Sequence, residues 1–137
     1  IQDGTIDAIA SDHRARSKDT KVQPFSAASV GASGIETLFS ITLDLVHKKI
    51  IDINKAISFL TINPAKIFGI DSPNLEEQKV ADFIVFDEDE PHIIKKENLK
   101  TSPTPFDGKK IHGKILATFI NGQVAFVDQI FKNKIIK

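Results

Sequence analysis

The chain has 137 residues, and its 18 Lys and Arg residues balance 18 Asp and Glu residues. This balance gives no indication of a nucleic acid or an anionic membrane surface as a partner. Cysteine is absent from the sequence, which excludes disulfide scaffolds, thiolate zinc sites and thiol nucleophiles.

The ends and the hydropathy of the chain give two further expectations. No apolar run approaches the length of a membrane span, so we expect a soluble protein. The sequence begins at Ile1 with neither an initiator Met nor a basic-then-apolar signal pattern. This beginning favours a cytoplasmic location and a chain that opens in the middle of a fold.

Residues 5–13, TIDAIASDH, contain the first candidate site. A short apolar run over 6–10 ends abruptly at Asp12 and His13. A buried parallel strand delivers reactive groups in this way to the mouth of an α/β barrel. Asp12 is therefore the candidate catalytic residue. The alternative is that Ser11 or Asp12 only caps the following turn.

A long polar segment follows over 14–34. Loops of this length inside compact domains are usually functional or disordered, and this one directly follows the carboxylate. We expect it to face a substrate. Arg14 and Arg16 are able to hold an anionic group by bidentate hydrogen bonds, and the alternative is an ordinary solvated basic loop.

The next segment has helical periodicity. Ser33 and Glu36 have the Ser-x-x-Glu spacing of a capping box, and apolar residues then recur at helical spacing. The pattern predicts a helix over 35–49. Its His47 stands among lysines and is interpreted as an ordinary surface residue.

Two shorter helices are predicted after it. Asp52 is placed as the N-cap of the first, whose apolar residues share one face. For the second, Asn63 is predicted as the cap, Pro64 as the first helical residue and Gly69 as the stop.

The character of the sequence changes at a turn-rich boundary over 71–74. The pattern predicts a strand over 81–86, closed by an acidic run at 87–91 that we interpret as a solvated turn rather than a metal site. Asn121-Gly122 lies between two apolar runs, 113–120 and 123–127, and predicts a hairpin with a type I′ turn.

These motifs resemble, in the same order, those of the dihydroorotases in the amidohydrolase superfamily. Residues 5–13 are similar to the last barrel strand of that family, which typically reads GTIDxIATDH. Residues 24–25 and 31–37, PF and GASGIET, resemble its Pro-Phe and GxxGxET motifs. TINPAKIFG at 61–69 resembles TxNPAKxxG, and ADFIVFD at 81–87 resembles its Ala-Asp strand.

The resemblance implies an α/β fold class. Residues 1–70 would form the last strand-loop-helix units of a (β/α)₈ TIM barrel, and residues 71–137 would form part of a small β-sandwich composite domain. A complete barrel needs about 250 residues. The chain would therefore be roughly the C-terminal third of such a protein.

The resemblance also implies a function. The full-length protein would be a zinc-dependent dihydroorotase that interconverts N-carbamoyl-L-aspartate and L-dihydroorotate in de novo pyrimidine biosynthesis. Asp12 matches the residue that ligates the metal and acts as general base. Val30 and Gly31 match the loop stretch whose backbone meets the substrate. Arg16 stands where the family has the second His of Asp-His-Ala-Pro-His, and a substrate-binding role is retained for it.

The resemblance implies one or two Zn²⁺ ions, but most of the family's metal ligands lie on earlier strands. A catalytic zinc ion needs about three protein ligands, so we expect the polypeptide alone to be inactive and to bind zinc weakly or not at all. His13 is expected to pack or to orient other groups rather than to bind metal.

Two alternatives remain open. One is another cyclic amidohydrolase, such as a hydantoinase or allantoinase. The other is a non-catalytic dihydroorotase homologue that partners aspartate carbamoyltransferase. The expected partners are a small-molecule substrate, a second copy in a homodimer and aspartate carbamoyltransferase, with neither nucleic acid nor membrane.

Overall fold

The computed structural model describes residues 1–71, 74–101 and 103–135. The elements in chain order are α1 (Lys18–Lys21), α2 (Leu38–His47), α3 (Ile53–Leu60), α4 (Ile62–Phe68), β1 (Phe83–Ile93), the 3-10 turn η1 (Lys96–Asn98), β2 (Lys110–Ile120), β3 (Gln123–Val127) and α5 (Gln129–Ile135). The strands form an antiparallel sheet in the order β1-β2-β3. Among the described residues, no helix is both long and apolar enough to span a bilayer.

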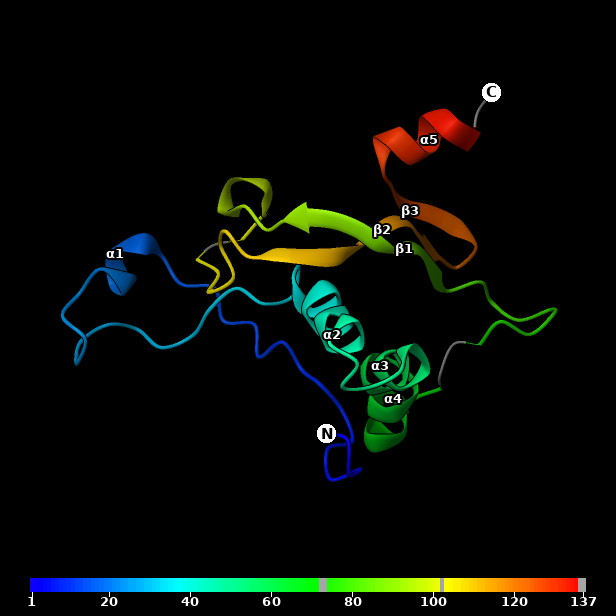
Figure 1. Cartoon of the computed structure of the whole chain (residues 1–137), viewed down its shortest axis with the longest axis horizontal. Coiled ribbons are helices and arrows are strands. Elements are labelled where there is room, and N and C mark those ends of the chain that lie inside the picture. The colour runs from blue at the N-terminus through cyan, green and yellow to red at the C-terminus, as the bar shows by residue number, and fades with distance from the viewer. Residues whose placement is uncertain (72–73, 102, 136–137) are drawn as a thin grey trace.

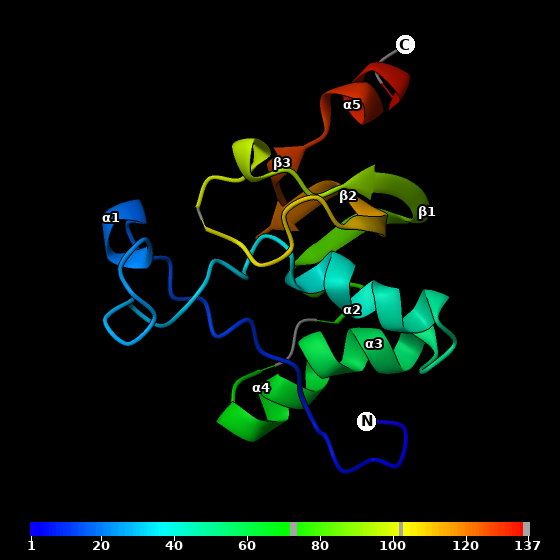
Figure 2. The same cartoon turned by 60° about the vertical axis from the view of Figure 1, so that its left-hand side comes forward.

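The elements form layers, with α2 between the sheet and α3 (Figure 1). The same order of layers is visible after rotation, and the segment that carries α1 projects to one side of them (Figure 2). The N-terminal coil runs past the helices on its way to α1 (Figures 1 and 2). This coil and the projecting segment contain the candidate site residues.

Helix α2 packs directly on the backbone of β2 at Gly113. Gly113 has a φ of +93°, and a Cβ at this position would overlap the Leu43 side chain, which is 1% exposed. The Ser40 hydroxyl donates to the Gly113 carbonyl at 3.0 Å. A glycine here allows the close approach of helix and strand, and any larger residue would push them apart.

The start of α3 is formed as the sequence predicts. The Asp52 carboxylate accepts a hydrogen bond of 2.9 Å from the Lys55 N–H, which confirms Asp52 as the N-cap. Ala56 and Phe59 lie one turn apart on the buried face, where they pack with Ile51. Burial of an aromatic side chain such as Phe59 contributes about 2–3 kcal/mol.

The helix expected over 35–49 begins later, and its capping box is absent. The helix starts at Leu38, and its N-cap Thr37 makes no side-chain cap hydrogen bond. Ser33 instead pairs with the Thr101 hydroxyl, and the Glu36 carboxylate accepts from the Thr101 N–H. The prediction was wrong because partners more than sixty residues away compete for the two side chains that the local pattern assigns to a cap.

Helix α4 also begins before its predicted cap. Thr61 is the N-cap, and Asn63 lies inside the helix, where its side chain donates to the Asp7 carbonyl at 2.7 Å. The N-terminal coil therefore competes successfully for Asn63. The predicted stop is confirmed, because Gly69 follows Phe68 in the left-handed conformation with φ +64°.

The strand predicted within 5–13 is not formed among the described residues. The coil there makes an isolated parallel bridge between His13 and Ala32, and Ile6 is 45% exposed rather than buried. The Ile9 N–H donates to the Phe59 carbonyl at 3.2 Å. A strand needs a neighbouring strand along its length, and α3 offers only this single contact.

The β-rich region differs from its prediction at the acidic run. β1 continues through 87–91 with a shift of register between Asp87 and Pro91. The Asp87 carboxylate accepts hydrogen bonds from the Asp89 and Glu90 N–H groups. The run is thus an exposed irregularity within a strand. The type I′ hairpin is confirmed, since Asn121 and Gly122 both have positive φ. The turn expected over 71–74 lies partly outside the described residues.

Candidate functional site

Asp12 ends the N-terminal coil with its side chain in the solvent. The side chain is 81% exposed, and its Oδ1 lies 3.2 Å from the Arg14 Nε. The backbone of Asp12 is left-handed, with φ +39°. Such a conformation is uncommon for a residue other than glycine and concentrates at functional sites. The geometry makes the carboxylate available to a ligand.

His13 connects the coil to the segment before α2. Its Nδ1 accepts hydrogen bonds from the N–H groups of Gly34 and Ile35, both at 3.3 Å. The Arg14 N–H donates to the Ala32 carbonyl at 2.9 Å. His13 therefore fixes the backbone on which Asp12 is carried, in agreement with the packing or orienting role expected for it.

Gly31 lies against the backbone of Arg14. Its φ is +110°, and a Cβ at this position would be 2.8 Å from the Arg14 carbonyl oxygen and 2.6 Å from its Cβ. Only glycine fits both the backbone conformation and the available space. The segment around Gly31 is thus held beside the residues that follow Asp12.

The far side of the loop is held by two cationic side chains. The Arg16 Nε donates to the Val30 carbonyl at 3.4 Å. The Lys21 ammonium donates to the carbonyls of Ser29 and Gly31, each at 2.9 Å. The structure therefore brings Asp12, Arg16, Val30 and Gly31 onto two adjoining stretches, 12–16 and 29–32, although Asp12 pairs with Arg14 rather than with Arg16.

A carboxylate fixes the start of α2 to the segment before β2. Glu36 accepts hydrogen bonds from the Lys100 N–H and the Thr101 N–H, both at 3.0 Å, and from the Thr101 hydroxyl at 2.9 Å. Partial cover of this carboxylate raises its pKa, but the hydrogen bonds from Lys100 and Thr101 outweigh it, so the pKa of Glu36 lies below its usual value.

This lowered pKa predicts a pH-dependent contribution to stability. A carboxylate whose pKa is lower in the folded state stabilises the fold above its unfolded pKa, and the contribution is lost as the pH falls through the folded value. In the natural protein, Glu36→Gln lowers the midpoint of thermal unfolding at pH 7. The difference in unfolding midpoint between the variant and the parent becomes smaller as the pH falls below 4.5, the ordinary pKa of a glutamate carboxyl group.

Glu97→Gln is the matched control for Glu36→Gln, because Glu97 is an exposed carboxylate in the neighbouring turn η1. Its effect on the unfolding midpoint is small at both pH values. A Glu36→Gln deficit that is unchanged between pH 7 and pH 3 contradicts the assignment of the effect to the ionised carboxylate.

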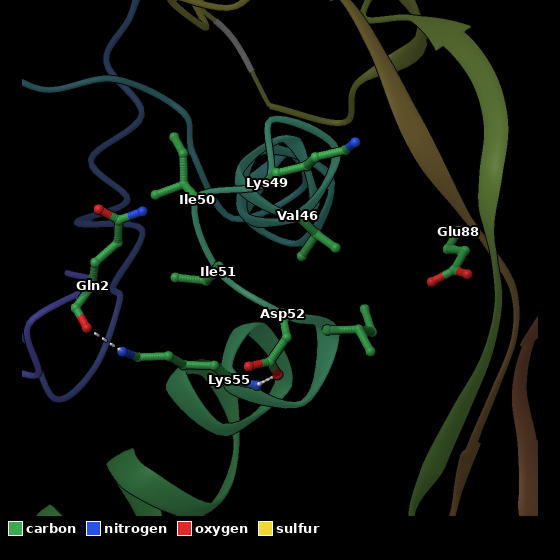
Figure 3. A pocket seen from close by; sticks show the side chains of 9 residues that line it. Gln2, Val46, Lys49, Ile50, Ile51, Asp52, Lys55 and Glu88 are labelled. Carbon is green, nitrogen blue, oxygen red and sulfur yellow. Dashed lines mark hydrogen bonds between the residues drawn. The ribbon is translucent and has the colours of Figure 1, made fainter.

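One cavity is remote from Asp12. It has a volume of about 740 Å³ and is lined by residues at the end of α2, the start of α3 and β1, together with Gln2 (Figure 3). Lys55 is one of the lining residues, and its ammonium donates to the Gln2 carbonyl at 3.0 Å (Figure 3). None of the candidate site residues lines this cavity, so its volume gives no information on the site.

The family model named Amidohydrolase family matches residues 1–125, which include Asp12 and the whole loop after it. The chain belongs to the amidohydrolase family.

Within the amidohydrolase family, the chain is similar in sequence to dihydroorotases. The chain is 38% identical over 129 residues to a dihydroorotase of Thermoanaerobacter sp. (strain X514), covering 92% of the chain and 30% of that protein. It is 37% identical over 132 residues to a dihydroorotase of Clostridium acetobutylicum, covering 94% of the chain and 31% of that protein. The chain therefore spans less than a third of the length of these relatives.

Solved hydantoinase structures contain a segment with the same fold as this chain. An L-hydantoinase (dihydropyrimidinase) from Arthrobacter aurescens matches with a TM-score of 0.84 and 25% identity, covering 92% of the chain and 30% of that protein. A D-hydantoinase matches with a TM-score of 0.84 and 21% identity, covering 93% of the chain and 30% of that protein. The described chain thus adopts the conformation of a corresponding part of these enzymes.

Sequence reasoning missed three features of this amidohydrolase chain. The Lys21 contacts give no sequence signal, because a lysine in a polar loop is unremarkable by composition. The Asp12–Arg14 ion pair was missed because two opposite charges two residues apart in a coil form no recognisable sequence pattern. The hydrogen bonds of Ser33 and Glu36 with Thr101 were missed because the spacing of these two residues in the sequence matches a capping box.

Proposed function

We propose that the natural protein containing this chain is a metal-dependent dihydroorotase, which interconverts N-carbamoyl-L-aspartate and L-dihydroorotate in pyrimidine biosynthesis. The observation that carries the proposal is the identity of 38% to a dihydroorotase over 92% of the chain, a span that includes the exposed carboxylate of Asp12. The proposal places this chemistry in the cytoplasm.

In this proposal residues 1–70 are the last part of a (β/α)₈ barrel and residues 71–137 are part of a smaller β-domain. The exposed apolar side chain of Ile6 and the nearly unpaired coil around it support a barrel neighbour beside them. Barrel active sites lie at the carboxyl ends of the strands, and Asp12 stands at the end of this segment.

Asp12 serves as general base and as a metal ligand. Its carboxylate accepts a proton from the attacking water, which adds to the ring carbonyl carbon, and returns the proton to the ring nitrogen as the C–N bond breaks. The reverse direction closes the ring and releases water. The exposure of Asp12 leaves the carboxylate free to exchange its contact with Arg14 for these roles.

The metal in the proposal is zinc. Asp12 supplies one oxygen donor, and no group of three or more potential ligand side chains comes together within the described residues, so the remaining ligands belong to other parts of the natural protein. When bound, zinc polarises the ring carbonyl and lowers the pKa of water.

Arg16, Val30 and Gly31 bind the substrate in this proposal. The Arg16 Nε donates to the Val30 carbonyl. The other N–H groups of the guanidinium remain able to form a bidentate pair with a carboxylate. Dihydroorotate carries such a carboxylate on its ring, whereas hydantoin and dihydrouracil do not. Arg16 therefore favours dihydroorotate over the hydantoinase-type substrates that the structural likeness to L-hydantoinase suggests as the second candidate.

A comparison of substrates tests the proposal. The natural protein, loaded with zinc, is assayed with dihydroorotate, dihydrouracil and hydantoin. We expect kcat/KM to favour dihydroorotate by at least about tenfold, because a group placed to bind the carboxylate is left unpaired by the other rings. A preference for hydantoin or dihydrouracil contradicts the proposal and supports the second candidate.

A further inference from the structure

Three successive backbone carbonyls in the loop are held by cationic side chains. Lys21 donates to the Ser29 and Gly31 carbonyls at 2.9 Å each, and Arg16 donates to the Val30 carbonyl between them at 3.4 Å. Lys21 is half-buried beneath the loop, so its two hydrogen bonds are partly shielded from water. Hydrogen bonds from an ammonium are among the stronger ones in proteins.

Fixing a carbonyl also fixes the N–H of the same peptide unit. In a trans peptide the C=O and the following N–H point in opposite directions within one plane. Lys21 therefore directs the Val30 N–H away from its own ammonium, because that N–H shares a peptide unit with the Ser29 carbonyl. Arg16 acts in the same way on the Gly31 N–H, which shares a unit with the Val30 carbonyl.

These two N–H groups are left without a protein partner. Within the part of the chain that the structure describes, neither the Val30 N–H nor the Gly31 N–H donates to a protein acceptor. Val30 is 74% exposed, and Gly31 lies against Arg14, which contacts Asp12. Backbone N–H groups without a protein partner are donors available to an anionic or carbonyl oxygen.

We propose that Lys21 is a positioning residue of the proposed active site: its ammonium holds the Ser29 and Gly31 carbonyls so that the Val30 N–H is presented to an oxygen atom of the ring substrate, beside the Gly31 N–H that Arg16 directs. The inference rests on the proposed function for the identity of the substrate. Lys21 itself touches no substrate, so its removal weakens substrate binding more than it slows the bond-breaking step.

Lys21→Met tests this proposal, because methionine keeps most of the aliphatic stem and lacks the ammonium. In the natural, zinc-loaded protein we expect KM for dihydroorotate to rise about tenfold while kcat changes by less than about twofold, since misplaced groups bind the ground state poorly. Lys21→Arg restores most of the lost affinity, because a guanidinium reaches the same carbonyls.

Lys18→Met is the matched control, since Lys18 lies on the same helix α1 and its ammonium makes no hydrogen bond within the described residues. Its KM stays within about twofold of the parent, because exposed single charges contribute little. Equal KM increases in Lys18→Met and Lys21→Met would assign the effect to loop charge and overturn the proposal.

Hydrogen exchange of the peptide spanning 29–32 supplies a readout that does not depend on activity. We expect the Ser29 N–H, which donates to the Thr20 carbonyl at 2.9 Å, to exchange faster in Lys21→Met than in the parent or in Lys18→Met, with an unchanged midpoint of thermal unfolding. Unchanged exchange overturns the proposed clamp, and faster exchange with an unchanged KM overturns its role in binding. If the parent turns over no dihydroorotate, the proposed function fails, while the exchange measurement still decides whether Lys21 holds the loop.

Discussion

Asp12→Asn lowers the turnover of dihydroorotate by the natural, zinc-loaded protein at least about a hundredfold, the range expected when a general base is removed. Asparagine keeps the shape of the side chain but is a poor proton acceptor and a weaker metal ligand. Steady-state rates in both directions of the reaction measure the loss. The midpoint of thermal unfolding stays close to that of the parent, because the exposed pair with Arg14 contributes little to stability.

Asp19→Asn is the control for Asp12→Asn, since Asp19 is an exposed carboxylate of the same loop, on α1. Its turnover stays within about twofold of the parent, because a solvated surface charge has little effect on a nearby reaction. Asp12→Asn turnover that also stays within about threefold of the parent contradicts the assignment of Asp12 as base and ligand.

Gly31→Ala lowers kcat/KM for dihydroorotate by about tenfold to a hundredfold, because it displaces the loop from the segment that carries Asp12. The new Cβ would lie 2.8 Å from the Arg14 carbonyl oxygen, and the backbone at φ +110° is unfavourable for any side chain. A displacement of about 1 Å at a site of this kind costs up to about a hundredfold in rate. Kinetic assays and hydrogen exchange over 29–32 measure the two consequences.

Gly4→Ala separates backbone strain from displacement of the loop. Gly4 also has a positive φ, +79°, but a Cβ there meets no atom within 4 Å. This variant carries the cost of the left-handed backbone, about 1 kcal/mol, without moving the site. If kcat/KM for dihydroorotate falls equally in Gly31→Ala and Gly4→Ala, the close approach of Gly31 to Arg14 does not contribute to activity.

The parts of the fold predicted correctly from the sequence depend on neighbours in the chain. Asp52 bonds to a backbone group three residues away, Gly69 ends its helix by its own conformation, and Asn121-Gly122 closes a two-residue turn. In each case the stabilising contact lies within the window of sequence that suggests it. Local patterns are reliable where no distant group competes.

The predictions that were wrong involve side chains with distant partners. Glu36 bonds to residues 100 and 101, and Asn63 bonds to the Asp7 carbonyl, although both have the local spacing of helix caps. The apolar run over 6–10 has the composition of a buried strand, but a ladder of hydrogen bonds requires a neighbouring strand that the described residues do not supply.

The motifs name the residues of the candidate site but give no sign of the contacts that hold it together. Asp12, Arg16, Val30 and Gly31 could be named from motifs, and the structure places them on two adjoining stretches of chain. The contacts that hold these stretches together come from His13 and Lys21, whose hydrogen bonds are to backbone atoms. Bonds to the backbone leave no complementary residue type in the sequence, so no pattern reveals them.

The metal dependence of dihydroorotate turnover tests the central claim most directly. The natural protein is assayed at its full length as purified, after removal of zinc by a chelator, and after zinc is restored. We expect turnover that is lost with the metal and returns with it. A folded, zinc-loaded protein that turns over no dihydroorotate contradicts the account and favours another cyclic amidohydrolase or a non-catalytic homologue that partners aspartate carbamoyltransferase.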